Sequence, residues 1–193
     1  MTLRNAQYLI TETDPMRLIA STSDVAFVGR SNVGKSSLIC AICENKKLAR
    51  VSKIPGRTRA VNIFEVARGR WIIDLPGYGY AVAEEKLKDY WPKMIGLTLS
   101  SRPHMACVFV LLDAEREVTP IDRSMMAWLR ENNIPFRVVG TKVDALPGSR
   151  QRESRTKMAQ SVGFLPEEIF WVSAKKGYGL KEMRQEISRL LKV

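Results

Sequence analysis

The residues from 29 to 36 carry the clearest chemistry in the chain, because they read Gly-Arg-Ser-Asn-Val-Gly-Lys-Ser. Gly29 and Gly34 allow a tight turn whose backbone N–H groups point inward and form a concave site for an anion. Lys35 adds a full positive charge, and the Ser36 hydroxyl is a ligand that Mg2+ accepts. This spacing predicts a loop that binds the phosphates of a nucleotide together with a magnesium ion.

The segments on both sides of this loop have the pattern that such a site needs. Residues 25–29 form a short apolar run that predicts a buried parallel strand, and residues 35–44 have the pattern of a helix. A strand, a glycine loop and a helix N-terminus together aim the helix dipole at the anion. A chance match over eight residues is the alternative, and this context disfavours it.

Two further motifs suit the terminal phosphate and the metal. Asp74-Leu-Pro-Gly77 follows a hydrophobic run, so that Asp74 would hold Mg2+ through a water and the Gly77 N–H would meet the γ-phosphate. Thr58 ends Pro55-Gly-Arg-Thr58, where a GTPase keeps the threonine that completes the Mg2+ shell. Taken singly, the first motif could be a turn and the second a chance threonine.

Two later motifs bear on the choice of base. Residues 141–144 read Thr-Lys-Val-Asp, and Asp144 could accept both N1–H and N2–H2 of guanine. A buried Asp144 facing adenine would be left unpaired, at a cost of about 1 to 3 kcal/mol or more. Lys142 is expected along the base and the phosphate loop, and Ala174, in Val-Ser-Ala-Lys at 172–175, is expected to place its N–H near guanine O6. The pair of motifs predicts GTP rather than ATP.

The predicted nucleotide contacts come from these five motifs, in the chain order that Ras-like GTPases require. They are Gly29, Arg30, Ser31, Asn32, Val33, Gly34, Lys35, Ser36 and Ser37, then Gly56, Arg57, Thr58, Arg59 and Ala60, then Asp74, Leu75, Pro76 and Gly77, then Thr141, Lys142, Val143 and Asp144, and finally Val172, Ser173, Ala174 and Lys175. The predicted metal ligands are Ser36, Thr58 and Asp74. The predicted catalytic residues are Lys35, Thr58, Gly77 and Asn32.

The elements that must position these residues alternate along the chain after residue 24. Strands are predicted at 25–29, 61–66, 70–74, 106–112, 136–140 and 169–172, and helices at 35–44, 84–100, 119–132, 151–161 and 179–191. This alternation predicts an α/β fold in three layers, a P-loop NTPase of the Ras-like G-domain type. Its sheet should be mostly parallel and six-stranded, with one antiparallel edge strand from a hairpin at 61–74.

Length indicates one domain, since 193 residues is only slightly more than an average one. We expect its core at about 22–193, after a short N-terminal extension at 1–21 that carries no motif. No export signal and no apolar run of membrane-spanning length is visible, so the expected location is the cytoplasm and no membrane partner is expected.

The charge indicates a polyanionic partner, because the formal net charge is +11. The basic residues gather in three groups, each of which could alone be a solvated face. The groups are Lys46, Lys47, Arg50, Lys53, Arg57 and Arg59; Arg150, Arg152, Arg155 and Lys157; and Lys175, Lys176, Lys181, Arg184, Arg189 and Lys192. Together they favour nucleic acid as the partner.

The cysteines and the single histidine suggest no second site. Cys40 and Cys43 have a CxxC spacing, but no second cysteine pair accompanies them, and we interpret them and Cys107 as packing residues of a reducing compartment. His104 is interpreted as a surface or turn histidine.

With these motifs in hand, the sequence resembles the EngB family of bacterial GTPases, also called the YihA or YsxC family. The octapeptide Asp-Leu-Pro-Gly-Tyr-Gly-Tyr-Ala at 74–81 is the most diagnostic piece, and the resemblance covers essentially the whole chain. Most GTPases carry Asn at position 141, where the amide ties the base loop to the phosphate loop, whereas Thr141 is similar to this family's own form.

The resemblance implies GTP and GDP as ligands, Mg2+ as cofactor, and a GTPase that acts in assembly of the large ribosomal subunit. It further implies binding to ribosomal RNA or to precursor particles and a need for normal cell division and septation. DNA is not expected specifically as a partner, and the expected state is a monomer. The basic excess agrees with RNA independently of the resemblance.

The residue after Gly77 bears on the rate of hydrolysis. Ras-like enzymes often carry glutamine there to orient the attacking water, whereas this chain has Tyr78, so we expect slow hydrolysis, no faster than about 10^-3 per second without a partner.

Asn32 either holds a K+ ion that supplies charge or is chosen for its loop conformation. The loops 45–60 and 76–83 are the expected switches, and Arg57 and Arg59 either reach the γ-phosphate or contact RNA.

Three alternative functions stay open at this point. An ATP-using phosphotransferase would share the phosphate loop but would not need Asp144 or Ala174. An RNA-binding module could bind nucleotide without hydrolysing it. A division-site GTPase could act directly on septation, although the charge ranks it below ribosome assembly.

Overall fold

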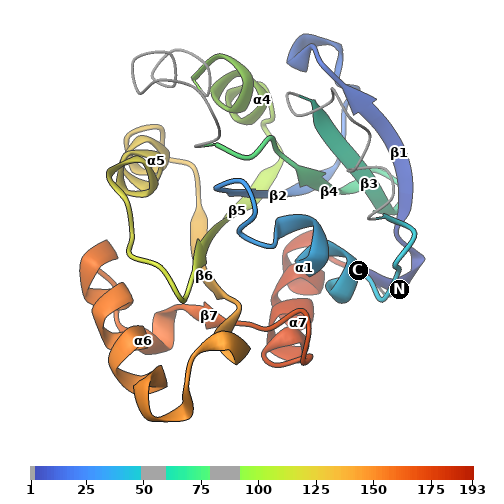
Figure 1. Ribbon diagram of the computed structural model, residues 1–193. Coiled ribbons are helices and arrows are strands. Elements are labelled where there is room, and N and C mark those ends of the chain that lie inside the picture. The colour runs from blue at the N-terminus through green and yellow to red at the C-terminus, as the bar shows by residue number, and fades with distance from the viewer. Residues whose placement is uncertain (1–2, 49–59, 79–91) are drawn as a thin grey trace.

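The computed structural model describes residues 3–48, 60–78 and 92–193, and its centre is a seven-stranded sheet (Figure 1). The strand order is β1-β3-β4-β2-β5-β6-β7. The strands are β1 (Gln7–Glu12), β2 (Ser23–Gly29), β3 (Val61–Ala67), β4 (Arg70–Asp74), β5 (Met105–Asp113), β6 (Phe136–Thr141) and β7 (Phe170–Trp171). Strands β4, β2, β5, β6 and β7 pair in parallel, while β3 runs antiparallel to both β1 and β4.

Helices cover both faces of this sheet. The α-helices are α1 (Lys35–Ile42), α4 (Leu97–Ser100), α5 (Pro120–Glu131), α6 (Gly148–Val162) and α7 (Leu180–Leu191). Short turns of 3-10 helix are η1 (Leu3–Asn5), η2 (Pro15–Arg17), η4 (Val143–Ala145) and η5 (Pro166–Glu168), and the π-helical turn η3 (Pro92–Gly96) leads into α4. Figure 1 shows α1 and α7 on one side of the sheet and α4, α5 and α6 on the other.

The central strand explains why two helical layers form. All seven residues of β2 are buried, as expected for a parallel strand covered on both faces. Val25 and Phe27 belong to the core cluster that includes α1 and α7, whereas Ala26 and Val28 belong to the cluster that includes α5 and α6. Alternate side chains of one strand therefore build two separate cores.

The fold class is confirmed, and the strand count is corrected from six to seven. The additional strand is β1, which pairs with β3 at one edge of the sheet, so the antiparallel strand β3 lies second from that edge. The apolar run of β1, at residues 8–10, is only three residues long, and four of the six residues of the strand are exposed. Of the helix predicted at 84–100, only residues from 92 onward lie in the described part.

The amino end of the parallel strands is closed by a buried ion pair. Asp24, fully buried at the start of β2, accepts from Arg102 Nε at 2.5 Å and from the Ser21 hydroxyl at 2.7 Å. The Arg102 guanidinium also lies 4.8 Å from the centre of the Trp71 ring.

Within the ranges given above, none of the helices combines the length and the apolar character that crossing a membrane requires.

Candidate functional site

The phosphate loop lies at the carboxyl end of the sheet, between the last residue of β2 and the first residue of α1. Gly34 has φ +98° and Asn32 has φ +65°, so the loop uses left-handed conformations at two positions. A Cβ on Gly29 would lie 2.8 Å from the Leu111 carbonyl oxygen, which leaves room for glycine alone. The turn predicted from the two glycines is therefore present, with the N-terminus of α1 behind it.

Lys35 and Asp74 meet beside this loop. Asp74 ends β4 and pairs in register with Phe27 of β2, which brings its carboxylate to the loop. Lys35 Nζ forms an ion pair with Asp74 Oδ1, and the two side chains are 12% and 3% exposed. Two of the predicted site residues are thus brought together, one from the start of α1 and the other from the end of β4.

Magnesium fits the donors that the chain offers here. The Ser36 hydroxyl and the Asp74 carboxylate are hard oxygen donors, the kind Mg2+ prefers. Within the described ranges, no group of three or more His, Cys, Asp or Glu side chains could hold a metal by itself. Phosphate oxygens of a nucleotide and the predicted ligand Thr58 would complete the shell of a magnesium ion at this place.

The segment from Leu75 to Tyr78 runs alongside the phosphate loop. Leu75 N–H donates to the Phe27 carbonyl at 3.1 Å, and Tyr78 N–H donates to the Gly29 carbonyl at 3.2 Å. Between them, Gly77 approaches Ser31 so closely that a Cβ would lie 3.0 Å from the serine Oγ. The predicted γ-phosphate contact, Gly77, is therefore held against the loop by bonds on both sides of it.

Thr141 joins the base loop to the phosphate loop. Its hydroxyl is buried and donates to the Val33 carbonyl at 2.7 Å, with the Leu112 carbonyl 3.2 Å away. The tie that an asparagine amide makes in most GTPases is made here by a threonine hydroxyl. One hydroxyl hydrogen suffices because the Val33 carbonyl lies directly beside the end of β6.

Lys142 extends from the same loop toward the phosphate loop. Its backbone is left-handed, with φ +58°, and its Cε lies 3.9 Å from where a Cβ on Gly34 would be. Its Nζ donates to Asp113 Oδ2 at 2.8 Å, so the carboxylate at the end of β5 fixes the lysine over the loop. The predicted placement of Lys142 agrees with this geometry, and Asp113 is a site residue that sequence reasoning missed.

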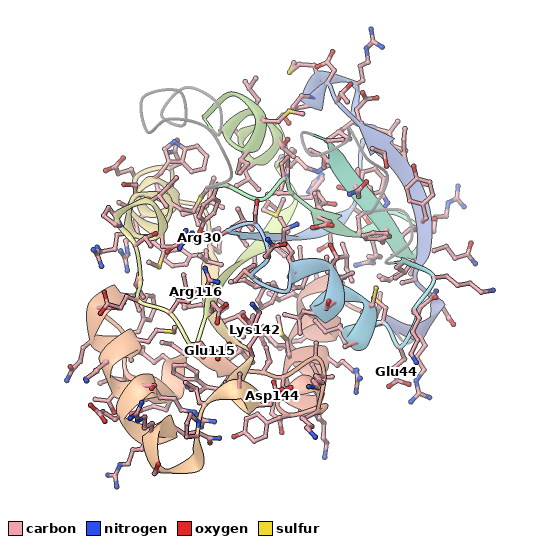
Figure 2. The ribbon with its side chains drawn as sticks, in the orientation of Figure 1. Arg30, Glu44, Glu115, Arg116, Lys142 and Asp144 are labelled. Atoms are coloured by element: carbon pink, nitrogen blue, oxygen red, sulfur yellow. The ribbon has the colours of Figure 1, made fainter. Side chains whose placement is uncertain are left out.

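A cavity of about 240 Å3 opens between these loops, and its lining matches the predicted base pocket. It is lined by Gly34, Ser37, Leu38, Thr141, Lys142, Asp144, Ala145, Val172, Ala174 and Lys175. Figure 2 shows Arg30, Lys142 and Asp144 following one another along the carboxyl end of the sheet. The two motifs predicted to read the base thus line one cavity together with the glycine loop.

The burial predicted for Asp144 is corrected, because its side chain is exposed. It stands in the short turn η4 at the rim of the cavity, one residue after buried Val143. Base choice by Asp144 must therefore rely on the paired hydrogen bonds more than on burial of an unpaired charge.

The last predicted motif is held by its own turn. Val172 N–H donates to the Gly140 carbonyl at 2.8 Å, and the buried Ser173 hydroxyl accepts from Lys176 N–H at 2.9 Å. This fixes the backbone of Ala174 at the cavity wall, where the sequence predicted it.

Several predicted residues cannot be followed in the structure. Gly56, Arg57, Thr58 and Arg59 lie outside the described residues, as do most of the two expected switch loops. Ala60, the last predicted contact of that segment, is buried, and Asn32 is exposed on the phosphate loop. The roles given to Thr58 and to Asn32 therefore stay predictions.

The cysteines and the histidine agree with their structural interpretation. Cys43 and Cys107 are buried in the core cluster beside α1 and α7, and burial raises the pKa of each thiol to about 12. Cys40 is half-buried and forms no disulfide. His104 is exposed in a turn before β5. None of the four lines the cavity described above.

Tyr78 has a hydrogen-bond partner that the sequence did not predict. It is 3% exposed, and its hydroxyl donates to Asp122 Oδ1 of α5 at 2.9 Å. Burial and, next, the neighbouring Asp122 charge hold the pKa of Tyr78 well above its ordinary value. The hydroxyl therefore points into the protein toward α5, and Asp122 was not a predicted site residue.

Comparison with known proteins gives a consistent result. Residues 24–142 match the family model described as 50S ribosome-binding GTPase. A probable GTP-binding protein EngB of Desulfatibacillum aliphaticivorans is 36% identical over 194 residues, covering 100% of this chain and 95% of the relative. The protein of the same name from Geobacter metallireducens is 35% identical, covering 99% of this chain and 94% of the relative.

A solved structure agrees with these relatives. The crystal structure of a probable GTP-binding protein engB superimposes with a TM-score of 0.71 at 25% identity, covering 88% of this chain and 99% of that one. The structural similarity thus covers most of this chain and nearly all of that one.

Proposed function

The chain belongs to the EngB family of GTP-binding proteins, and from this premise we propose that it is a GTP-dependent switch in assembly of the large ribosomal subunit. The observation that carries the proposal is the union of a phosphate loop and a base cavity through the Thr141 bond to Val33. Because this hydrogen bond joins the base loop to the phosphate loop, a nucleotide that fills the cavity would contact both loops at once.

The chain's own residues supply binding and orientation. The loop N–H groups and Lys35 would bind the phosphates, and Asp144 with the Ala174 N–H would bind the base. A magnesium ion held by Ser36 and, through water, by Asp74 would neutralise charge on the phosphate oxygens. Lys35 forms an ion pair with Asp74, the residue proposed to hold the metal through water. Its charge therefore lies between the proposed metal position and the phosphate loop.

Hydrolysis by the isolated protein is proposed to be slow. The Tyr78 hydroxyl is engaged by Asp122 inside the protein, so it does not orient an attacking water. We expect a rate no faster than about 10^-3 per second without a partner, raised by the ribosomal precursor. Asn32, exposed on the loop, remains the candidate K+ ligand, and equal rates in KCl and NaCl would remove that role.

The proposed macromolecular partner is ribosomal RNA. The second and third basic groups lie close together, because the Arg155 guanidinium is 5.3 Å from the centre of the Trp171 ring and 5.5 Å from that of Tyr178. Arg150, Arg152, Lys175 and Lys176 surround this contact in sequence, and all four are exposed.

Not every basic residue is available for such a partner. Arg184 donates to the Ala41 and Ile42 carbonyls at the end of α1, and Arg189 pairs with Glu186 at 2.8 Å. Among the described residues, no ion pair joins Arg150, Arg152, Lys175 or Lys176 to an acid. The uncompensated charge thus supports a polyanion at the surface of α6 and the loop before α7.

The test is sedimentation with the large ribosomal subunit in the presence of a nonhydrolysable GTP analogue or GDP. The wild type should co-sediment with the analogue more than with GDP, and less as salt is raised. Arg150→Ala with Arg152→Ala should weaken binding and reduce the salt dependence by about two phosphate contacts. Arg17→Ala with Arg68→Ala removes the same charge from exposed positions elsewhere and should not.

Three results would contradict the proposal. Binding that ignores the nucleotide would favour an RNA-binding module without a switch, as would a Lys35→Ala protein that still supports assembly in cells. Concentration at the septum without co-sedimentation would favour a direct role in division. In the proposed order of events the septation defect follows from failed assembly, and the protein acts in the cytoplasm as a monomer.

A further inference from the structure

Tyr78 occupies the position directly after Gly77, yet its side chain leaves the nucleotide site. Its hydroxyl is buried and donates to Asp122 Oδ1 at 2.9 Å. Because that hydroxyl has a carboxylate partner inside the protein, it is a fixed contact and not a group waiting for a ligand.

Asp122 uses its other oxygen on its own helix. It lies in the first turn of α5, 2% exposed, and Oδ2 accepts from the Thr119 N–H at 2.9 Å and from the Thr119 hydroxyl at 2.6 Å. This is the capping box of α5. One buried carboxylate therefore joins the N-terminus of α5 to the residue that follows Gly77.

The backbone of Tyr78 is fixed as well. Its N–H donates to the Gly29 carbonyl at 3.2 Å, and its carbonyl accepts from the Ser31 N–H at 3.0 Å. Tyr78 is therefore attached to the phosphate loop by its backbone and to α5 by its side chain. The hydrogen bond of the Tyr78 N–H holds the plane of the peptide group that joins Gly77 to Tyr78. Only the φ and ψ angles of Gly77 lie between that plane and the Gly77 N–H.

We propose that Tyr78 is a positioning residue whose bond to Asp122 holds the Gly77 amide for the terminal phosphate of a nucleoside triphosphate. This inference rests on the proposed function, in which the Gly77 N–H meets the γ-phosphate. A diphosphate lacks that γ-phosphate, so the bond should affect the triphosphate selectively. The bond also makes α5 a part of the site that distinguishes the two nucleotides.

The test compares two variants, each of which removes one hydroxyl group that donates a hydrogen bond to the Asp122 carboxylate. Tyr78→Phe removes the bond between Gly77's neighbour and α5, whereas Thr119→Val removes a capping bond and leaves Tyr78 in place. Affinities for a nonhydrolysable GTP analogue and for GDP are measured by calorimetry in the presence of Mg2+, and thermal unfolding is followed in parallel.

Both variants should unfold at a lower temperature, because each leaves Asp122 with one partner fewer. Tyr78→Phe should bind the GTP analogue about fivefold more weakly, the loss of one ordinary hydrogen bond, with its GDP affinity within about twofold of wild type. Thr119→Val should leave the ratio of the two affinities unchanged. Asp122→Ala, which removes the acceptor and keeps the tyrosine, should shift the ratio in the direction that Tyr78→Phe does.

A Tyr78→Phe protein with the wild-type ratio would overturn the inference while leaving the proposed function intact. An equal shift in Thr119→Val would also overturn it, because the effect would then reflect the stability of α5 alone. A wild-type protein that binds neither guanine nucleotide would contradict the proposed function itself.

Discussion

The two ends of the parallel sheet carry the same kind of ion pair in different surroundings. At the amino end, Asp24 and Arg102 are 0% and 5% exposed, and the pair is enclosed by Ser21 and Trp71. At the carboxyl end, Lys142 is 37% exposed beside Asp113, and it lines a cavity of about 240 Å3. The first pair is closed on itself, whereas the second is open to a ligand.

Both pairs join an aspartate to a basic residue, so the residue types do not distinguish a structural pair from a ligand-binding one. The exposure of the basic side chain does. A closed ion pair offers no free charge, and its loss leaves a buried charge without a partner. An open pair holds a cation that a phosphate or a base can also contact. The expectations below follow from that contrast, because variants at one end should change stability and variants at the other should change binding.

The largest effect on stability is expected from Arg102→Met. The substitution leaves the Asp24 carboxylate buried and unpaired, which should lower the free energy of unfolding by about 3 to 5 kcal/mol. Denaturant unfolding measures it, and the GDP affinity of the folded protein should stay within about twofold.

Adding Asp24→Asn to Arg102→Met provides the control. The double variant removes the buried charge and should regain part of the lost stability. A strong loss of GDP affinity in the single variant would break the proposed separation of the two ends.

At the other end, Lys35→Ala should weaken GDP binding about 100-fold, or roughly 2.7 kcal/mol, through the loss of a charge-assisted contact to phosphate. Calorimetric titration measures it. Lys157→Ala is the matched control, because Lys157 is an exposed lysine that pairs with Glu153 on α6, away from the cavity. Equal losses in both variants would contradict the assignment of Lys35.

A smaller effect should separate Thr141→Val from Thr141→Ser. Valine keeps the shape but leaves the Val33 carbonyl without its bond, at about 1 kcal/mol or a fivefold loss of GDP affinity. Serine retains the hydroxyl and should stay near wild type. Fluorescence measurement of nucleotide dissociation distinguishes them, and identical values would mean that the tie between the loops is dispensable.

The functional residues at the carboxyl end of the sheet were predicted from the sequence, whereas the ion pair at the amino end was not. The reason is physical. Lys35, Asp74 and Asp144 belong to motifs whose spacing is imposed by the ligand, so they are recognisable in a single chain. Asp24 and Arg102 are 78 residues apart, and no local pattern predicts that they meet.

Three other findings escaped prediction because they depend on tertiary contact. Strand β1 has an apolar run of only three residues, at 8–10, and its place in the sheet depends on its pairing with β3. Asp113 and Asp122 are ordinary acids in sequence, and only the packing of β5 and α5 brings them to Lys142 and Tyr78. The exposure of Asp144 likewise depends on where η4 ends at the rim.

The last expected effect concerns alkaline pH and the core behind the site. Unfolded thiols ionise near pH 9.0, while burial raises the pKa of Cys43 and Cys107 to about 12 in the fold. The folded chain then binds more protons, so stability should fall as pH rises from 9 toward 12, by about 1.4 kcal/mol per thiol at pH 10. Chemical denaturation at pH 8 and pH 10 measures the slope.

Cys43→Ala with Cys107→Ala should flatten that slope. The GDP affinity of the folded protein should not follow it, because neither thiol lines the cavity. An unchanged slope in the double variant would assign the alkaline loss to other groups.

Asp144 and its cavity are proposed to select guanine over adenine, which would turn a general phosphate loop into a GTP switch. Calorimetric titration of GDP and ADP into the wild-type protein in the presence of Mg2+ tests it most directly. We expect GDP to bind at least about 100-fold more tightly than ADP, because a site built to pair with N1–H and N2–H2 rejects a base that lacks them. Equal affinities for the two nucleotides would contradict the account.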